Sequence, residues 1–188
     1  DRERASLDRS LTSLREVCGR EVIPIQLPIG EEQSFTGVVD LVSMKAINFS
    51  ANGNGKPSGS EIPENMTDAV NSARELLIEM VAEADDALME RFFEAGTLTQ
   101  SELEQGLRTA VVNRRVFPLV CSSAATNIGV HPVLDTIKAY VPSPDEHPLP
   151  AIGFESGEPV TYDVGDDAPA TAFVWKTIAD PFAGRINL

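Results

Sequence analysis

The chain has 188 residues, 42% of them hydrophobic, which suffices for one good core or two small ones. Its 29 acidic residues against 15 basic ones give a formal net charge of −14 and exclude broad contact with a phosphate backbone, so we expect no direct nucleic-acid binding. No apolar run reaches the roughly 18 residues of a membrane span, and we therefore expect a cytoplasmic protein without a membrane partner.

An amphipathic helix is expected near the start of the chain. Four apolar residues recur there at helical spacing, and a glycine follows them as a stop signal. These residues are Leu7, Leu11, Leu14, Cys18 and Gly19. We expect this apolar stripe to pack against a sheet.

Three strands are predicted after this helix. Residues 22–27, 36–42 and 44–49 carry β-branched and aromatic side chains between turn signals, which favours a small antiparallel sheet. The stretch 52–60, NGNGKPSGS, has the composition of a mobile loop. Its Gly-Lys pair lacks the GxxxxGK[ST] spacing of a phosphate-binding loop, so we do not expect phosphate binding there.

Three consecutive helices are predicted next. Residues 65–84 place apolar side chains at the helical period, and residues 87–94 predict a shorter helix. Thr99 and Glu102 have the T-x-x-E spacing of a capping box, which predicts a further helix to about Val112. We expect these helices to cover the sheet.

Most of the negative charge lies on this helical layer. Between Glu61 and Gln105 there are twelve acidic residues and two basic ones. A solvated outer face is the common reason for such a charge run. The alternative is a docking surface for a basic partner, with Glu75, Glu79 and Glu83 as the residues to test.

Residues 116–144, VFPLVCSSAATNIGVHPVLDTIKAYVPSP, predict a buried strand, a small-residue loop and a helix. The apolar run 117–121 is short enough for a central strand. Small side chains at 122–125 would let backbone N–H groups contact a planar ligand, although an ordinary strand-to-helix connection has the same pattern. The helix is expected to begin near Val130, with Pro132 in its first turn.

The last part of the chain predicts a boundary and two strands. Four prolines within 142–150 mark a stiff linker. Residues 170–178 predict a strand, and DPFAG at 180–184 predicts a turn into another strand. Because the chain starts without Met in a helical pattern and stops within a strand, we expect a piece of a larger polypeptide.

No catalytic or metal-binding pattern is found. Asp85 and Asp86 are neighbours, and neighbours on a helix point about 100° apart, so their carboxylates do not converge. The serines of the small-residue loop lack the G-x-S-x-G elbow and an identifiable base. Cys18 and Cys121 form no CxxC or metal-ligand spacing, and we expect reduced core residues.

Four stretches together resemble the translational GTPases of the elongation factor G family, and the resemblance covers the whole chain. IQLPIGEEQSFTGVVDLVSMKAI at 25–47 is similar to the first strands of the subdomain inserted into the GTPase domain, often called G prime. VAEADDALMERFFEAGTLT at 81–99 resembles its helical segment. Residues 120–144 resemble the return to the GTPase core, and FVWKTIADPFAGRINL at 173–188 resembles the opening of the following β-barrel domain.

The resemblance implies a domain organisation. Residues 1–20 would be the GTPase-domain helix after the NKxD motif, 21–115 the G prime subdomain, 116–142 the end of the GTPase domain, 143–168 a linker and 169–188 the start of β-barrel domain II. The implied fold class is α/β with an α+β insert: the end of a P-loop GTPase domain carrying a small sheet-plus-helices subdomain, then the first strands of a barrel.

The resemblance also implies a guanine site. In the family the pair matching Ser123 and Ala124 is the fifth guanine-nucleotide motif, where a backbone N–H reads guanine O6; adenine would oppose that donor with another donor. Asp1 resembles the last residue of NKxD, whose carboxylate accepts from guanine N1 and N2. The implied cofactor is GTP or GDP, with Mg²⁺ in the intact parent. In the family the phosphate loop, switches and magnesium ligands precede Asp1, so this chain would not hydrolyse GTP alone.

The family usually has GSAFKNKG where this chain has SSAATNIG. Because of these differences, the chain also resembles an elongation factor G-like paralogue. The implied function is part of a translation elongation factor that couples GTP hydrolysis to ribosomal translocation, with this chain supplying guanine recognition and a ribosome-facing subdomain. The implied partner is the ribosome, whose stalk protein would meet the acidic helical layer. The alternative is a stand-alone acidic protein-binding module without nucleotide binding.

Overall fold

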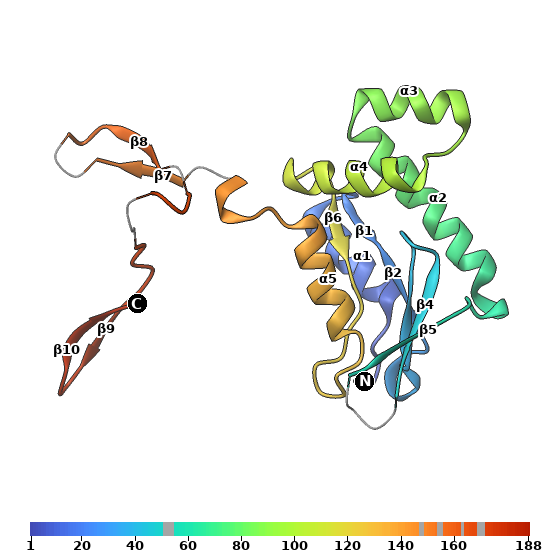
Figure 1. The fold of residues 1–188 in the computed structure, drawn as a ribbon. Coiled ribbons are helices and arrows are strands. Elements are labelled where there is room, and N and C mark those ends of the chain that lie inside the picture. The colour runs from blue at the N-terminus through green and yellow to red at the C-terminus, as the bar shows by residue number, and fades with distance from the viewer. Residues whose placement is uncertain (51–54, 147–148, 154–155, 163, 169–171) are drawn as a thin grey trace. The chain divides into compact units, whose positions relative to one another are not determined.

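The computed structural model describes residues 1–50, 55–146, 149–153, 156–162, 164–168 and 172–188. The chain divides into two compact units, Asp1–Val141 and Pro142–Leu188. The larger unit mixes helices with small sheets, as Figure 1 shows, and this agrees with the α+β character expected from the sequence.

The elements of the larger unit are, in chain order, α1 (Leu7–Cys18), β1 (Val22–Pro24), β2 (Gln26–Ile29), η1 (Glu32–Ser34), β3 (Gly37–Asp40), β4 (Lys45–Phe49), β5 (Pro57–Ser60), η2 (Glu64–Met66), α2 (Thr67–Glu83), α3 (Asp86–Ala95), α4 (Gln100–Val112), β6 (Phe117–Leu119) and α5 (Val130–Tyr140). Those of the smaller unit are η3 (Pro144–Glu146), β7 (Leu149–Ile152), β8 (Pro159–Tyr162), β9 (Thr177–Asp180) and β10 (Gly184–Asn187).

A four-stranded antiparallel sheet in the order β2-β3-β4-β5 confirms the predicted small sheet and extends it by one strand. The extra strand, β5, lies within the stretch 52–60 that composition had indicated as a loop; residues 52–54 lie outside the described residues. Because β5 is an edge strand, backbone pairing with β4 is enough to hold it. Pro57 is its first residue, a position that tolerates the missing N–H.

Residues 22–27 form two strands and not the single one that was predicted. β1 pairs with β6 in parallel, whereas β2 joins the antiparallel sheet. Ile25, only 3% exposed, lies between them. Its N–H donates to the Leu119 carbonyl and its own carbonyl accepts from Leu41 N–H, both at 3.0 Å. The chain therefore passes from one sheet into the other without a loop.

The main core lies between the antiparallel sheet and helices α2 and α4 (Figure 1). Six of its fully buried side chains come from these elements and from the turn directly after β3, and are Val39, Leu41, Leu77, Val81, Leu103 and Leu107. Helix α3 contributes no fully buried residue. Its Leu88, Met89 and Phe92 are partly buried against the same core, so α2 and α4 supply the fully buried side chains and α3 supplies partly buried ones.

The capping box at the start of α4 is confirmed. Thr99 N–H donates to Glu102 Oε2 at 2.9 Å, and Glu102 N–H donates to Thr99 Oγ1 at 3.3 Å. One turn later Gly106 is buried where α4 crosses its neighbours. A Cβ there would lie 2.5 Å from Leu88 Cδ1 and 2.7 Å from Val81 Cγ1, so the close approach of the three helices depends on this glycine.

The smaller unit contains two hairpins, β7 with β8 and β9 with β10. The first falls within 143–168, the range that the resemblance assigns to a linker. The second confirms the predicted turn: Asp180 Oδ1 accepts from Phe182 N–H at 2.8 Å and from Ala183 N–H at 2.7 Å. Of the strand predicted over 170–178, only the last two residues lie in a strand, β9; residues 172–176 are not in a strand, and 170 and 171 lie outside the described residues.

Within the part of the chain that the structure describes, no helix is both long and apolar enough to span a bilayer.

Candidate functional site

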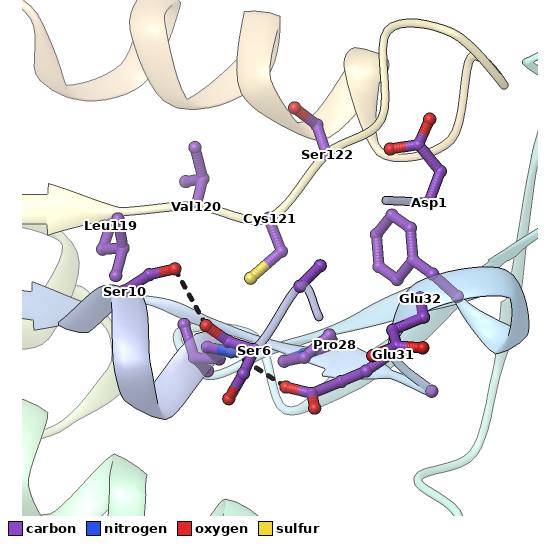
Figure 2. Close-up of a pocket in the computed structure, with 14 residues that line it drawn as sticks. Asp1, Ser6, Ser10, Pro28, Glu31, Glu32, Leu119, Val120, Cys121 and Ser122 are labelled. Carbon is purple, nitrogen blue, oxygen red and sulfur yellow. Dashed lines mark hydrogen bonds between the residues drawn. The ribbon is translucent and has the colours of Figure 1, made fainter. Parts of the chain in front are cut away.

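Asp1 lines two pockets of the larger unit. The first has a volume of about 300 Å³ and is also lined by Ser6, Glu31, Cys121 and Ser122. Figure 2 shows it, with Asp1 beside the segment that carries Cys121 and Ser122. The second, of about 350 Å³, takes Asp1 together with residues further along the same loop, Thr126 and Ile128. The structure thus brings Asp1 to the loop between β6 and α5, nearly 120 residues later in the chain.

A short backbone bridge closes this loop. Ser123 N–H donates to the Ile128 carbonyl at 2.8 Å, and Ile128 N–H donates to the Ser123 carbonyl at 3.1 Å. The Ser123 hydroxyl oxygen, in a side chain that is 3% exposed, also accepts from Thr126 N–H at 3.2 Å. The backbone N–H of Ser123 is therefore used within the loop, and Ser123 acts by holding its shape.

Ala124 is an exposed residue of the loop tip with an available donor, and its neighbour Ala125 is exposed as well. Its side chain and backbone are exposed, and its N–H makes no hydrogen bond to any residue that the structure describes. Of the two residues that the Ser-Ala pair offered, Ala124 therefore supplies the N–H that can recognise a ligand.

Gly129 allows the loop to return to α5. It has φ +75°, and a Cβ at this position would lie 2.5 Å from the Cys121 carbonyl oxygen. Asn127 also has a positive φ, of 56°. Because a side chain at Gly129 would clash with the backbone at the loop entrance, this glycine fixes the two ends of the loop close together.

Three residues at the site carried no signal in the sequence. Gln26, at the start of β2, accepts from Cys121 N–H through Oε1 at 3.3 Å. Glu31 Oε1 accepts from Leu7 N–H, and Glu32 Oε1 accepts from Arg4 N–H, both at 2.8 Å. These bonds join segments far apart in the chain, and no local pattern could have indicated them.

Strand β6, which was predicted to be a buried central strand, is less covered than expected. Among the described strands it pairs only with β1, and Phe117 is 43% exposed. The prediction of a core position is also wrong for Cys18, which is exposed at the end of α1, while Cys121 is half-buried.

We expect Cys121 to react slowly with alkylating reagents. Burial, with a further contribution from the Glu31 carboxylate, raises the pKa of its thiol from 9.0 to about 11. Since the thiolate is the nucleophile, this shift lowers its fraction at pH 8 on the order of 100-fold. Mass spectrometry after iodoacetamide treatment should show much slower labelling of Cys121 in the native protein than in urea. Equal rates in the two states would contradict the burial argument.

The acidic residues proposed for docking lie away from this site. Glu75, Glu79 and Glu83 are exposed on α2, and none of them lines the two pockets at Asp1. Glu83 forms a salt bridge with Arg20 at 2.9 Å. Among the described residues, no group of three or more His, Cys, Asp or Glu side chains could hold a metal ion.

No family model matches the chain. It is similar to a solved structure, that of ttk003000868 from Thermus thermophilus, with 27% sequence identity and a TM-score of 0.72. The match covers 97% of this chain and 24% of the Thermus protein, so the chain spans about a quarter of that protein's length. A fold similar to this mixed α/β arrangement thus occurs as a segment of a longer protein.

Proposed function

We propose that this chain is the guanine-recognising part of a GTP-binding translation elongation factor similar to elongation factor G. The observation that carries the proposal is that Asp1 shares two pockets with residues that flank the Ser123-Ala124 pair, although the pair itself is not among the residues that line them. The similarity of the chain to a segment of a longer protein supports the expectation of a larger polypeptide.

The chemistry of the two groups suits guanine. The Asp1 carboxylate is an acceptor only, and guanine offers it donors at N1 and the 2-amino group. The free N–H of Ala124 is a donor, and guanine O6 accepts it. Adenine presents an amino group at the position of O6, so a site of this kind would leave Ala124 opposed by a second donor.

The residues at the pockets fit a base and not its phosphates. Glu31 and Glu32 are the charged side chains that line the first pocket with Asp1, and all three are acidic. Phosphates and Mg²⁺ would therefore be held by segments of the complete polypeptide outside this chain, as would the hydrolytic machinery. The chain's own residues supply base recognition.

Competition binding tests the proposal. The complete natural polypeptide that contains this chain is titrated with a fluorescent GDP analogue, which is then displaced by GDP or by ADP. We expect GDP to compete at least 100-fold better than ADP, because the hydrogen-bonding pattern of the base differs at positions 1, 2 and 6. Equal competition, or no binding of the analogue, would favour the alternative of an acidic protein-binding module.

The proposal includes a partner for the acidic helical layer. In the proposed elongation factor, α2 would face the ribosomal stalk protein through Glu75 and Glu79. Glu83 is less suitable for a test, since its replacement would also break the salt bridge to Arg20.

We expect the double variant Glu75→Lys/Glu79→Lys to weaken binding of the stalk protein's terminal domain about tenfold at low salt. The loss should shrink as salt is raised, because screening weakens interactions between exposed charges. Surface plasmon resonance at several salt concentrations measures it. Glu16→Lys, on the exposed face of α1, is the control, and unchanged affinity in the double variant would remove the docking surface from the proposal.

A further inference from the structure

We infer that residues 26–32, here called the clamp segment, hold the two parts of the proposed guanine site, Asp1 and the Ala124 loop, in position relative to each other. The inference rests on the proposed function. The segment comprises β2 and the start of the turn after it. Gln26 at one end fixes the Ala124 loop, and Glu31 with Glu32 at the other end fix the chain that begins at Asp1. All three are positioning residues, since none needs to touch the base.

Gln26 is an unusual residue for its place. It is 1% exposed and follows the apolar strand β1. A buried amide destabilises the fold unless it is hydrogen-bonded, and its Oε1 accepts from Cys121 N–H. Among the described residues, the buried polar side chains are Gln26 and Ser123, and both hold this one loop.

The bond from Gln26 acts at the entrance of the loop. Cys121 follows the last residue of β6 by two positions and precedes the bridge at Ser123 by two. Ile25 N–H, one residue before Gln26, donates to the Leu119 carbonyl. The path from β6 into the loop is therefore fixed first by backbone pairing and then by the Gln26 side chain.

The other end of the clamp segment holds the start of α1. Ser6, the N-cap residue of α1, makes no side-chain cap hydrogen bond. Glu31 supplies an acceptor in its place and accepts a hydrogen bond from Leu7 N–H, and Glu32 accepts one from Arg4 N–H. A carboxylate at a helix N-terminus is a favourable, charge-assisted acceptor. Residues 4–7 are thus tied to the clamp segment, and Asp1 is three residues away.

The strand between these anchors is held along its length. β2 pairs with β3 from Gln26↔Asp40 to Ile29↔Gly37. The anchors at its two ends therefore keep a constant separation, and this limits how far the segment that carries Asp1 can move from the Ala124 loop. Loosening either anchor should weaken recognition of the base without removing a contact to it.

Two sets of variants in the complete natural polypeptide test the clamp, with GDP and IDP as probes. Gln26→Met removes the acceptor at similar side-chain length. We expect it to weaken GDP and IDP about tenfold each, because both carry the O6 that the loop reads. Glu31→Ala/Glu32→Ala should weaken GDP about tenfold and IDP less, because IDP lacks the 2-amino group that Asp1 would accept from.

The conservative pair Glu31→Gln/Glu32→Gln keeps carbonyl acceptors at both positions. It should restore GDP affinity to within a few-fold of the wild type, which a general loss of stability would not do. Wild-type affinity in both Gln26→Met and the Ala pair would overturn the clamp while leaving the proposed function intact.

Hydrogen exchange separates a failure of the clamp from a failure of the proposed function. If the wild-type polypeptide shows no preference for GDP over ADP, the proposed function fails. The clamp is then judged by amide exchange in Gln26→Met. Faster exchange confined to residues 121–128 supports it. Unchanged exchange there, or an increase that extends over α4, would overturn it.

Discussion

Replacing Ala124 by Pro in the complete natural polypeptide is expected to weaken GDP binding by at least tenfold. Proline has no backbone N–H, so the substitution removes the donor that we propose for guanine O6. Leaving the O6 acceptor unpaired in a desolvated site is destabilising by about 1–3 kcal/mol, which corresponds to roughly tenfold to 100-fold in affinity. Isothermal titration with GDP and ADP measures the effect, and the preference for GDP should fall with the affinity.

Two neighbouring substitutions separate the donor from the conformation of the loop. Ala124→Gly keeps the N–H and should bind GDP within a few-fold of the wild type. Ala125→Pro also places a proline in the exposed loop and leaves the Ala124 N–H in place. GDP affinity that is equal in Ala124→Pro and wild type would remove Ala124 from the site.

The second large effect is expected at Gly106→Val. A Cβ at Gly106 would already lie 2.5 Å from Leu88 Cδ1, and the valine methyl groups would add further overlap among α2, α3 and α4. Overpacking of a dense core destabilises by about 1–3 kcal/mol and sometimes more. We expect amides of α4 to exchange on the order of 100-fold faster in hydrogen–deuterium exchange, since local opening there becomes easier.

Gln105→Val is the matched control for this substitution. It introduces the same β-branched side chain one position earlier in α4, where the residue is exposed. Its effect should be limited to helix propensity, a few tenths of a kcal/mol. Similar exchange rates in the two variants would show that the three helices can accommodate a side chain at Gly106 without loss of stability. That outcome would contradict the close packing described above.

Local signals explain why the helices were predicted well. The Thr99–Glu102 box acts over three residues, and the observed α4 begins at Gln100, directly after it. Gly19 likewise ends α1 one residue after Cys18. In both cases the residues that set the boundary lie within one turn of it, so the sequence alone contains the information.

The positions of the strands depend on pairing partners that are distant in the chain and that no local sequence pattern indicates. Whether residues 22–27 make one strand or two is decided by β6, about 95 residues later, which pairs with β1 and not with β2. β5 forms in a Gly- and Ser-rich stretch because β4 offers it backbone partners. For the same reason the hairpin of β7 and β8 was not predicted from its proline-rich surroundings.

The candidate site likewise combines residues that the sequence indicates with residues that only the structure reveals. Asp1, Ser123 and Ala124 are predicted site residues from the family resemblance, and the structure places Asp1 at two pockets that loop residues on either side of the Ser123-Ala124 pair also line. The structure also distinguishes the two loop residues, because the N–H of Ser123 is consumed by the bridge to Ile128. Gln26 could not be found from the sequence, since a single glutamine gives no sign that it will be buried against Cys121.

The parallel pairing of β1 with β6 has a consequence for the order in which the protein folds. Helices α2 to α4 can form from contacts close in sequence, whereas Val22 meets Phe117 only after a loop of about 95 residues has closed. We therefore expect the helical layer to gain protection early in refolding and the loop at Ala124 to become ordered last. A newly made chain would then order the proposed ligand-binding loop only when the rest of the larger unit is complete, and binding of a ligand there would require a fully folded unit.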